Sequence, residues 1–154
     1  NITLKEGQKA EVNLEAVDWI RRVGRFVREG CVVTIDYGDS AEELYAPHRM
    51  EGTLMCYRNH IAHDNPYIHV GEQDITAHVN FSALVRAGRE TSLDGSWTTQ
   101  REFLAAEGVF ELLSGHDGAD PFGPAARMNR AVRQLLVSDQ MSELFKVLVQ
   151  TKKR

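Results

Sequence analysis

The hydrophobic positions near the start of the chain change from a helical spacing to a strand-like run. Apolar side chains recur on one helical face over residues 14–29, after Asn13, a good N-cap, and before Gly30, which suits a helix C-terminus. The continuous apolar run Cys31–Ile35 follows and ends at Asp36-Tyr37-Gly38. Such a run is typical of a strand buried on both faces. A helix followed by a buried strand is half of a parallel α/β unit, so we predict an α/β fold.

The sequence pattern that indicates helices and strands is weaker between Asp39 and Asp74. We expect an extended excursion between strands of the sheet there. The elements predicted from there on are a short strand at Thr53–Arg58, a loop around Asp64–Pro66, a helix capped by Asn80 and ending near Gly88, a strand at Glu90–Leu93, a helix that opens with a capping box at Thr99 and Glu102, a helix with Pro124 in its first turn, and a final strand at Phe145–Val149. The family resemblance described below implies that Glu90–Leu93 and Phe145–Val149 complete the edge of the sheet.

Composition narrows the class of protein. The chain has 154 residues, a net charge of −4 and no apolar run near the ~20 residues that span a bilayer, so we expect one domain and no membrane insertion. The first residues lack the features of a signal peptide, which favours a cytosolic or organelle-matrix location. Negative net charge disfavours nucleic-acid binding. The two cysteines, Cys31 and Cys56, have no Cys-x-x-Cys spacing, and we expect reduced structural thiols, with Cys31 buried.

The end of the first strand is the first candidate site. Open α/β sheets bind ligands beyond the carboxyl ends of their strands, and Asp36, Tyr37 and Gly38 stand at such an end. In the alternative interpretation, Asp36 only accepts hydrogen bonds from the following loop amides and Gly38 only supplies a turn. The residues alone leave both interpretations open.

A second candidate lies in the polar stretch before Asn80. Asp74, Thr76, His78 and Asn80 alternate with apolar residues, so in an extended segment they line one face. Such a face is either a polar wall, in which Asp74 binds a cation and His78 moves a proton, or an edge strand that leads into the N-cap Asn80.

The sequence shows neither an established metal-binding motif nor a cofactor-binding motif. The set of His60, His63, Asp64, His69 and His78 resembles a metal site, but its spacing matches no established motif, so we predict surface or hydrogen-bonded histidines and no metal. None of the twelve glycines forms a Gly-x-Gly turn, and there is no Walker loop, Gly-x-Ser-x-Gly elbow or His-Glu-x-x-His. The chain therefore shows no cofactor cradle of its own.

Several motifs together resemble one known family, the MidA family of class I methyltransferases. The order and spacing match along nearly the whole chain, with Ser142 where the family usually has glycine and Asn80 where it commonly has aspartate. The motifs are Gly-Cys-Val-Val-Thr-Ile-Asp-Tyr-Gly at 30–38, Gly-Thr-Leu at 52–54, Tyr-Arg-x-His at 57–60, Gly-x-x-Asp-Ile-Thr-Ala-His-Val-Asn-Phe at 71–81, Thr-Thr-Gln-x-x-Phe-Leu at 98–104 and Met-Ser-Glu-Leu-Phe-Lys-Val-Leu at 141–148.

This resemblance implies the C-terminal half of a Rossmann-like class I methyltransferase domain over residues 1–154, with S-adenosylmethionine as the cofactor of the intact protein and its binding loop upstream of Asn1. The isolated chain would then be inactive. The mitochondrial member of the family assembles respiratory complex I and methylates an arginine of a core subunit. The resemblance therefore implies a protein substrate such as a complex I subunit or its homologue, in the cytoplasm of a bacterium or in the mitochondrial matrix of a eukaryote.

Methylation of a guanidinium requires a group that holds the cation and one that takes up a proton. By the resemblance, Asp36, Asp74 and His78 are the candidate catalytic residues. The candidate substrate-binding residues are Tyr37, Gly38, Arg58, His60, Thr76 and Asn80. The alternative function is a noncatalytic partner-binding or assembly module, which the missing glycine loop fits equally well.

Overall fold

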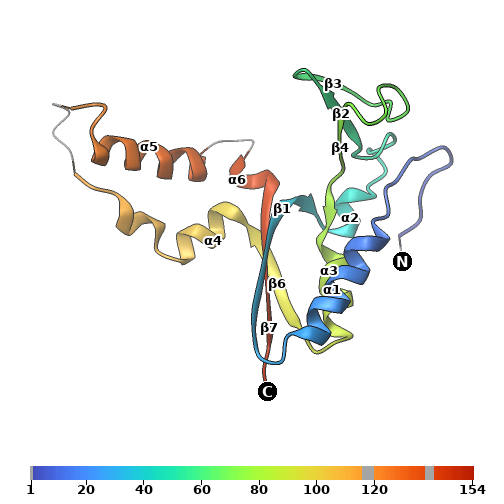
Figure 1. Ribbon diagram of the computed structural model, residues 1–154, viewed down its shortest axis with the longest axis horizontal. Helices are drawn as coiled ribbons and strands as arrows, with labels where there is room; N and C mark the ends of the chain where they lie inside the picture. Colours follow the sequence, from blue (N-terminus) through green and yellow to red (C-terminus); the bar gives the residue numbers. More distant parts are fainter. Residues whose placement is uncertain (1, 116–119, 138–140) are drawn as a thin grey trace. The chain divides into compact units, whose positions relative to one another are not determined.

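The computed structural model describes residues 2–115, 120–137 and 141–154, and these form the helices and strands of an α/β protein (Figure 1). Contacts divide the chain into two compact units. The first unit comprises residues 1–31, 38–94 and 150–154, and the second comprises residues 32–37 and 95–149. Among the described residues, no helix is both long and apolar enough to cross a membrane.

The core of the first unit forms where helix α1 (Leu14–Phe26) packs against helix α3 (Phe81–Arg89). Asn13 caps α1, with its side chain accepting from the Ala16 amide at 2.9 Å. Gly24 of α1 allows close packing, because a Cβ there would lie 1.9 Å from the Thr91 hydroxyl oxygen. The large side chains Ile20 and Phe81 are fully buried at this contact, and the short helix α2 (Ala41–Leu44) also packs against α3.

The predicted excursion contains a three-stranded antiparallel sheet in the order β3-β2-β4. Its strands are β2 (Met55–Arg58), β3 (Ile61–His63) and β4 (Asp74–Thr76). A two-residue turn joins β2 to β3, and its residues Asn59 and His60 have φ values of 50° and 65°, as tight hairpin turns require. The predicted strand therefore exists, starting two residues later than expected at Met55.

A second sheet has the strand order β5-β1-β7-β6. Its strands are β1 (Gly30–Asp39), β5 (Val79–Asn80), β6 (Asp94–Thr99) and β7 (Phe145–Lys152). The short strand β5 pairs in parallel with the last two residues of β1, with Gly38 opposite Val79 and Asp39 opposite Asn80. The sheet confirms the predicted α/β class.

Helices of the second unit pack around a small apolar cluster. Helix α4 (Gln100–Ala106) opens with the predicted capping box, and helix α5 (Pro124–Val137) opens with the predicted proline. Between them lies a 3-10 turn (Val109–Leu112), and helix α6 (Met141–Leu144) precedes β7. The buried cluster comprises Val109, Val132 and Leu136, with Leu104 packed against it.

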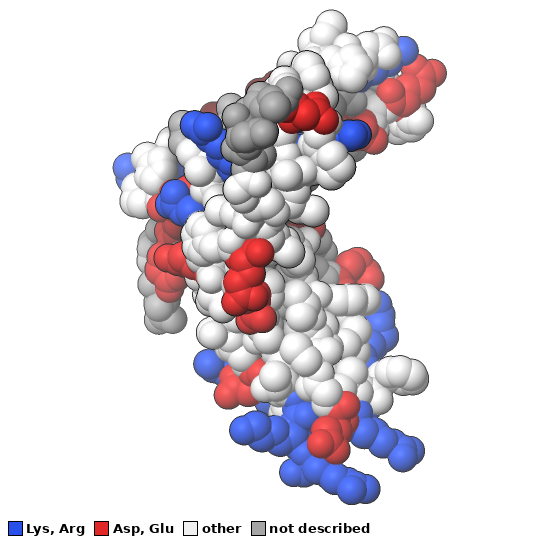
Figure 2. All heavy atoms as spheres, turned by 90° about the vertical axis from the view of Figure 1, so that its left-hand side faces the viewer, with Lys and Arg blue, Asp and Glu red and all other residues white. Residues whose placement is uncertain are grey.

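Uncharged residues predominate on the face that Figure 2 shows, with acidic and basic side chains scattered among them. Lys and Arg are most frequent at its lower end, and elsewhere on this face single basic side chains lie among acidic and uncharged ones.

Three predictions about burial and edges were wrong. Strand β1 is not buried on both faces, since Cys31 is exposed and Val33 and Ile35 are 50% and 54% exposed. A continuous apolar run does not reveal whether the second face of its strand is covered. Strand β7 is not at the edge, because it lies between β1 and β6 in the sheet order, and Leu148 and Gln150 on it are fully buried.

The predicted strand at Glu90–Leu93 is a turn. The amides of Thr91 and Leu93 both donate to the Gly88 carbonyl, at 2.9 and 3.0 Å, and this closes α3 before β6 begins at Asp94. Helix α1 ends at Phe26, three residues earlier than expected, because Val27 already has an extended backbone with ψ of 121°.

Candidate functional site

Strand β1 continues to Asp39, so Asp36, Tyr37 and Gly38 lie within the strand and not beyond its end as predicted, and they make local contacts there. One Asp36 carboxylate oxygen accepts from the neighbouring Tyr37 amide at 2.8 Å. The Tyr37 ring meets the Phe145 ring edge-on, with 5.8 Å between the ring centroids. Gly38 belongs to the first unit and packs against β5, where a Cβ would lie 2.1 Å from the Val79 carbonyl oxygen. Close strand packing, not a turn, is therefore what requires a glycine at this position.

The polar stretch from Asp74 to Asn80 is not one continuous strand. Strand β4 ends at Thr76 and β5 begins at Val79, and the two belong to different sheets. The Thr76 hydroxyl donates to the Met55 carbonyl at 3.3 Å, and the His78 amide donates to the Thr53 hydroxyl oxygen at 3.0 Å. The alternation thus holds over Asp74 and Thr76, where both residues lie in β4.

Arg58 and His60 lie at the β2–β3 hairpin. The Arg58 guanidinium donates to Glu72 Oε2 at 2.7 Å and to His69 Nδ1 at 3.0 Å, so it ties the loop at residues 64–73 to strand β2. His60 is exposed in the hairpin turn. His63 lies 6.5 Å from His69 between ring centroids, and within the described residues no group of three or more His, Cys, Asp or Glu could hold a metal ion.

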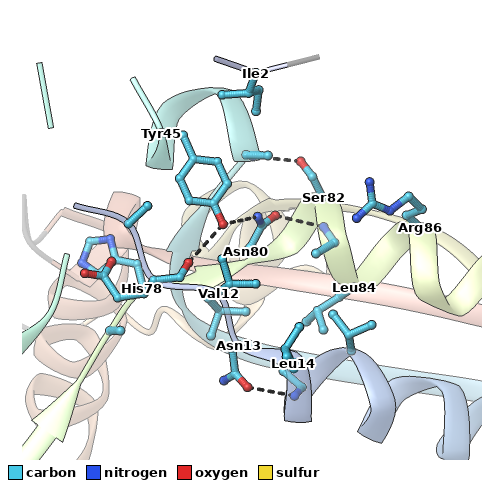
Figure 3. A pocket seen from close by; sticks show the side chains of 18 of the residues that line it. Ile2, Val12, Asn13, Leu14, Tyr45, His78, Asn80, Ser82, Leu84 and Arg86 are labelled. Atoms are coloured by element: carbon cyan, nitrogen blue, oxygen red, sulfur yellow. Dashed lines mark hydrogen bonds between the residues drawn. The ribbon is translucent and has the colours of Figure 1, made fainter. Parts of the chain in front are cut away.

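His78 and Asn80 line a pocket of about 910 Å³ in the first unit (Figure 3). Asn80 caps α3, accepting from the Ala83 amide at 2.9 Å, and its Nδ2 donates to the Tyr45 hydroxyl oxygen at 3.3 Å. The Tyr45 hydroxyl in turn donates to the Glu11 carbonyl at 3.1 Å. The prediction that Asn80 caps a helix is confirmed.

Sequence reasoning missed Tyr45 and Glu11, which bring the segment before α1 into this site. The Glu11 carboxylate accepts from the Thr53 amide and hydroxyl, both at 2.9 Å, and from the Leu54 amide at 3.3 Å. These partners lie more than forty positions along the chain, so no local motif could have indicated them. The remaining lining is mainly apolar, and its further charged residues are Arg21, Glu42 and Arg86.

Three glycines of the packed helices and strands are closely surrounded by other parts of the chain. Glycines can let a backbone approach a nucleotide-like ligand closely, but a Cβ added at Gly24, Gly38 or Gly88 would lie 1.9–2.1 Å from other atoms of the chain, so these three glycines serve internal packing. The residues that line the 910 Å³ pocket include no glycine. We therefore assign no cofactor-binding residue within the part of the chain that the structure describes.

Comparison with known proteins identifies the family. The sequence profile of a family described as "Putative S-adenosyl-L-methionine-dependent methyltransferase" matches residues 1–99, so the chain belongs to this methyltransferase family. None of the curated proteins compared with the chain matches it significantly.

Two crystal structures from Burkholderia thailandensis are similar to the chain. One is of an uncharacterised conserved protein, with 37% sequence identity, a TM-score of 0.89, and coverage of 98% of this chain and 40% of that one. The other is described as a "likely methyl transferase" bound to S-adenosyl-homocysteine, with 37% identity, a TM-score of 0.88, and coverage of 98% and 39%. The chain thus spans about two fifths of the length of these proteins.

Proposed function

We propose that this chain forms the substrate side of an S-adenosylmethionine-dependent methyltransferase that acts on arginine in a protein. The observation that carries the proposal is the 37% identity, over 98% of the chain, to a structure bound to S-adenosyl-homocysteine, the product left when the cofactor has given up its methyl group. The missing Gly-x-Gly turn supports the further proposal that the cofactor loop lies in the part of such proteins that this chain does not match.

The resemblance to the MidA family and the carboxylates of the chain support arginine as the acceptor. Methylation of a guanidinium replaces one N–H bond by an N–CH₃ bond and releases a proton. Asp74 is exposed and would pair with the guanidinium. Asp36 is the second candidate for this pairing, because only one of its carboxylate oxygens accepts from the Tyr37 amide. His78 would receive the proton, since imidazole titrates near neutral pH. A subunit of respiratory complex I or its homologue is the proposed substrate protein.

The test is methyl transfer by a protein that has the full length of the relatives and contains this chain. We expect radiolabelled methyl groups from S-adenosylmethionine to appear on arginine, identified by mass spectrometry of the modified protein. The 154-residue chain alone should show no tight cofactor binding by calorimetry, and low-micromolar binding would contradict the proposed division of the site. A full-length protein that retains partner proteins but transfers no methyl group would favour the noncatalytic alternative.

Asp74→Asn tests the role of the carboxylate. If Asp74 holds a guanidinium, single-turnover transfer should fall by ~10²-fold or more, since a charge-assisted contact in the transition state is lost. The melting temperature and the cofactor affinity should not change, because Asp74 is exposed. Unchanged transfer with unchanged cofactor binding would remove Asp74 from the site.

A further inference from the structure

The register of the three-stranded sheet places an aromatic ring beside Asp74. In the β2–β4 pair, Tyr57 lies directly opposite Asp74, and in the β2–β3 pair it lies opposite Ala62. Directly opposite residues of antiparallel strands project from the same face, with Cβ atoms roughly 4.5–5.5 Å apart. On this face the Tyr57 ring therefore stands between a carboxylate on one side and a small methyl group on the other.

Both side chains are accessible to a ligand. Tyr57 is 43% exposed although it lies in the central strand of the sheet, and Asp74 is exposed. The Asp74 side chain makes no hydrogen bond or ion pair with any of the described residues.

The adjacent cation does not neutralise this carboxylate. Arg58 follows Tyr57 in β2, and successive side chains of a strand project to opposite faces. On its own face Arg58 is already bound to Glu72 and His69. The Tyr57 face of the sheet thus combines an unpaired negative charge with an uncovered aromatic ring.

This combination suits a guanidinium better than an ammonium group. A guanidinium is planar, so it can pair with a carboxylate through two parallel N–H bonds while its flat face stacks on an aromatic ring. An ammonium is compact and strongly hydrated, and it gains less from stacking. Because the face is negative and aromatic, its complementary occupant is an arginine side chain of a protein.

We propose that Tyr57 is a specificity-determining residue for the arginine acceptor, with its ring lying against the guanidinium that Asp74 holds. This inference rests on the proposed function and adds the residue that would distinguish arginine from lysine. Tyr57 positions the acceptor and exchanges no proton with it.

The test compares Tyr57→Leu and Tyr57→Phe in the full-length protein, with a Gly-Arg-Gly peptide and its lysine and citrulline counterparts as probes. A cation over an aromatic ring contributes enough that Tyr57→Leu should raise the KM for the arginine peptide roughly 2- to 10-fold, while kcat changes less. Tyr57→Phe keeps the ring and should restore a KM near that of the wild type. Tyr67→Leu is the matched control, because Tyr67 is 87% exposed in the same excursion but lies outside the three strands, and its KM should not change.

Direct binding of the same peptides, measured by NMR, separates failure of this inference from failure of the proposed function. If the protein methylates arginine but Tyr57→Leu behaves like Tyr67→Leu in both KM and binding, the inference is overturned and the proposed function stands. If methyl groups appear on another residue type while arginine-peptide binding still depends on Tyr57 and Asp74, the guanidinium site is supported and the proposed acceptor is wrong. Equal binding of the arginine and citrulline peptides by the wild type would also overturn the site.

Discussion

Replacing Gly88 by alanine should destabilise the first unit, although alanine normally favours a helix. Gly88 is buried near the end of α3. A Cβ at this position would lie 2.1 Å from the Gln150 side-chain nitrogen and 2.7 Å from the Leu93 carbonyl oxygen. Neither atom can move freely, because Gln150 is fully buried and the Leu93 amide is bound to the Gly88 carbonyl.

The magnitude follows from three opposing effects. Overpacking costs roughly 1–3 kcal/mol, and unpairing the Gln150 amide from the Leu93 carbonyl costs about as much, whereas alanine in place of glycine in a helix returns about 1 kcal/mol. We expect a net loss of about 2–3 kcal/mol in the free energy of unfolding and a melting temperature lower by roughly 4–12 °C.

Urea unfolding and thermal melting, followed by circular dichroism, measure this effect. Gly115→Ala is the matched control, since a Cβ at Gly115 meets no atom within 4 Å, and its unfolding free energy should stay within about 0.5 kcal/mol of the wild type. Adding Gln150→Ala to Gly88→Ala should cost less than the sum of the two single changes, because the Gln150 atoms that clash are gone. A Gly88→Ala variant at least as stable as the wild type would refute the reasoning.

Three further experiments test the α3 cap, the burial of the two cysteines and the Arg21–Glu90 ion pair. Asn80→Ala should destabilise the protein by about 1 kcal/mol in urea unfolding because the α3 cap is lost, whereas Asn80→Asp keeps the cap oxygen and should stay close to the wild type. In the native protein, maleimide should label the exposed Cys31 quickly and the buried Cys56 only after unfolding, as mass spectrometry can show; equal rates would contradict the assigned burial. The hydrogen bond from Arg21 holds the pKa of Glu90 below its ordinary value near 4.5. The contribution of this pair to stability is therefore present above that pH and is lost as the pH falls through the lowered pKa. An NMR titration of Arg21→Gln should show the Glu90 pKa raised towards its ordinary value.

The elements that the sequence predicted well depend on neighbours within a few positions. The caps of α1 and α3 at Asn13 and Asn80 and the box at Thr99 each bond an amide three residues ahead. Such signals are complete within a short window, so they need no knowledge of the fold. The strand at Cys31–Ile35 was predicted for a related reason, since an apolar run marks a strand wherever it lies.

Burial depends on distant segments, and there the sequence was misleading. Phe145–Val149 was expected at the edge of the sheet, yet β7 lies inside the sheet, and even Lys146 on it is only 8% exposed. Glu90–Leu93 is a turn for a local reason, because the amides of Thr91 and Leu93 donate to the Gly88 carbonyl, and the residue types in this segment did not reveal that turn. The Glu11 carboxylate was overlooked because its partners, Thr53 and Leu54, lie far along the chain, beyond α2.

The candidate site was also only partly predictable from the sequence, because it depends on which residues of neighbouring strands lie opposite one another. Alternation along β4 placed Asp74 and Thr76 on one face, but no property of that segment shows which residue of β2 lies opposite. A slip of one residue in the β2–β4 pairing would turn Asp74 to the other face, beside Arg58, and the carboxylate would be neutralised instead of open to a substrate. In the β2–β3 pair, the two-residue turn at Asn59 and His60 places Ala62 next to the Tyr57 ring. His60 was predicted to bind substrate, and the structure gives it a structural role, in the turn that sets the β2–β3 register.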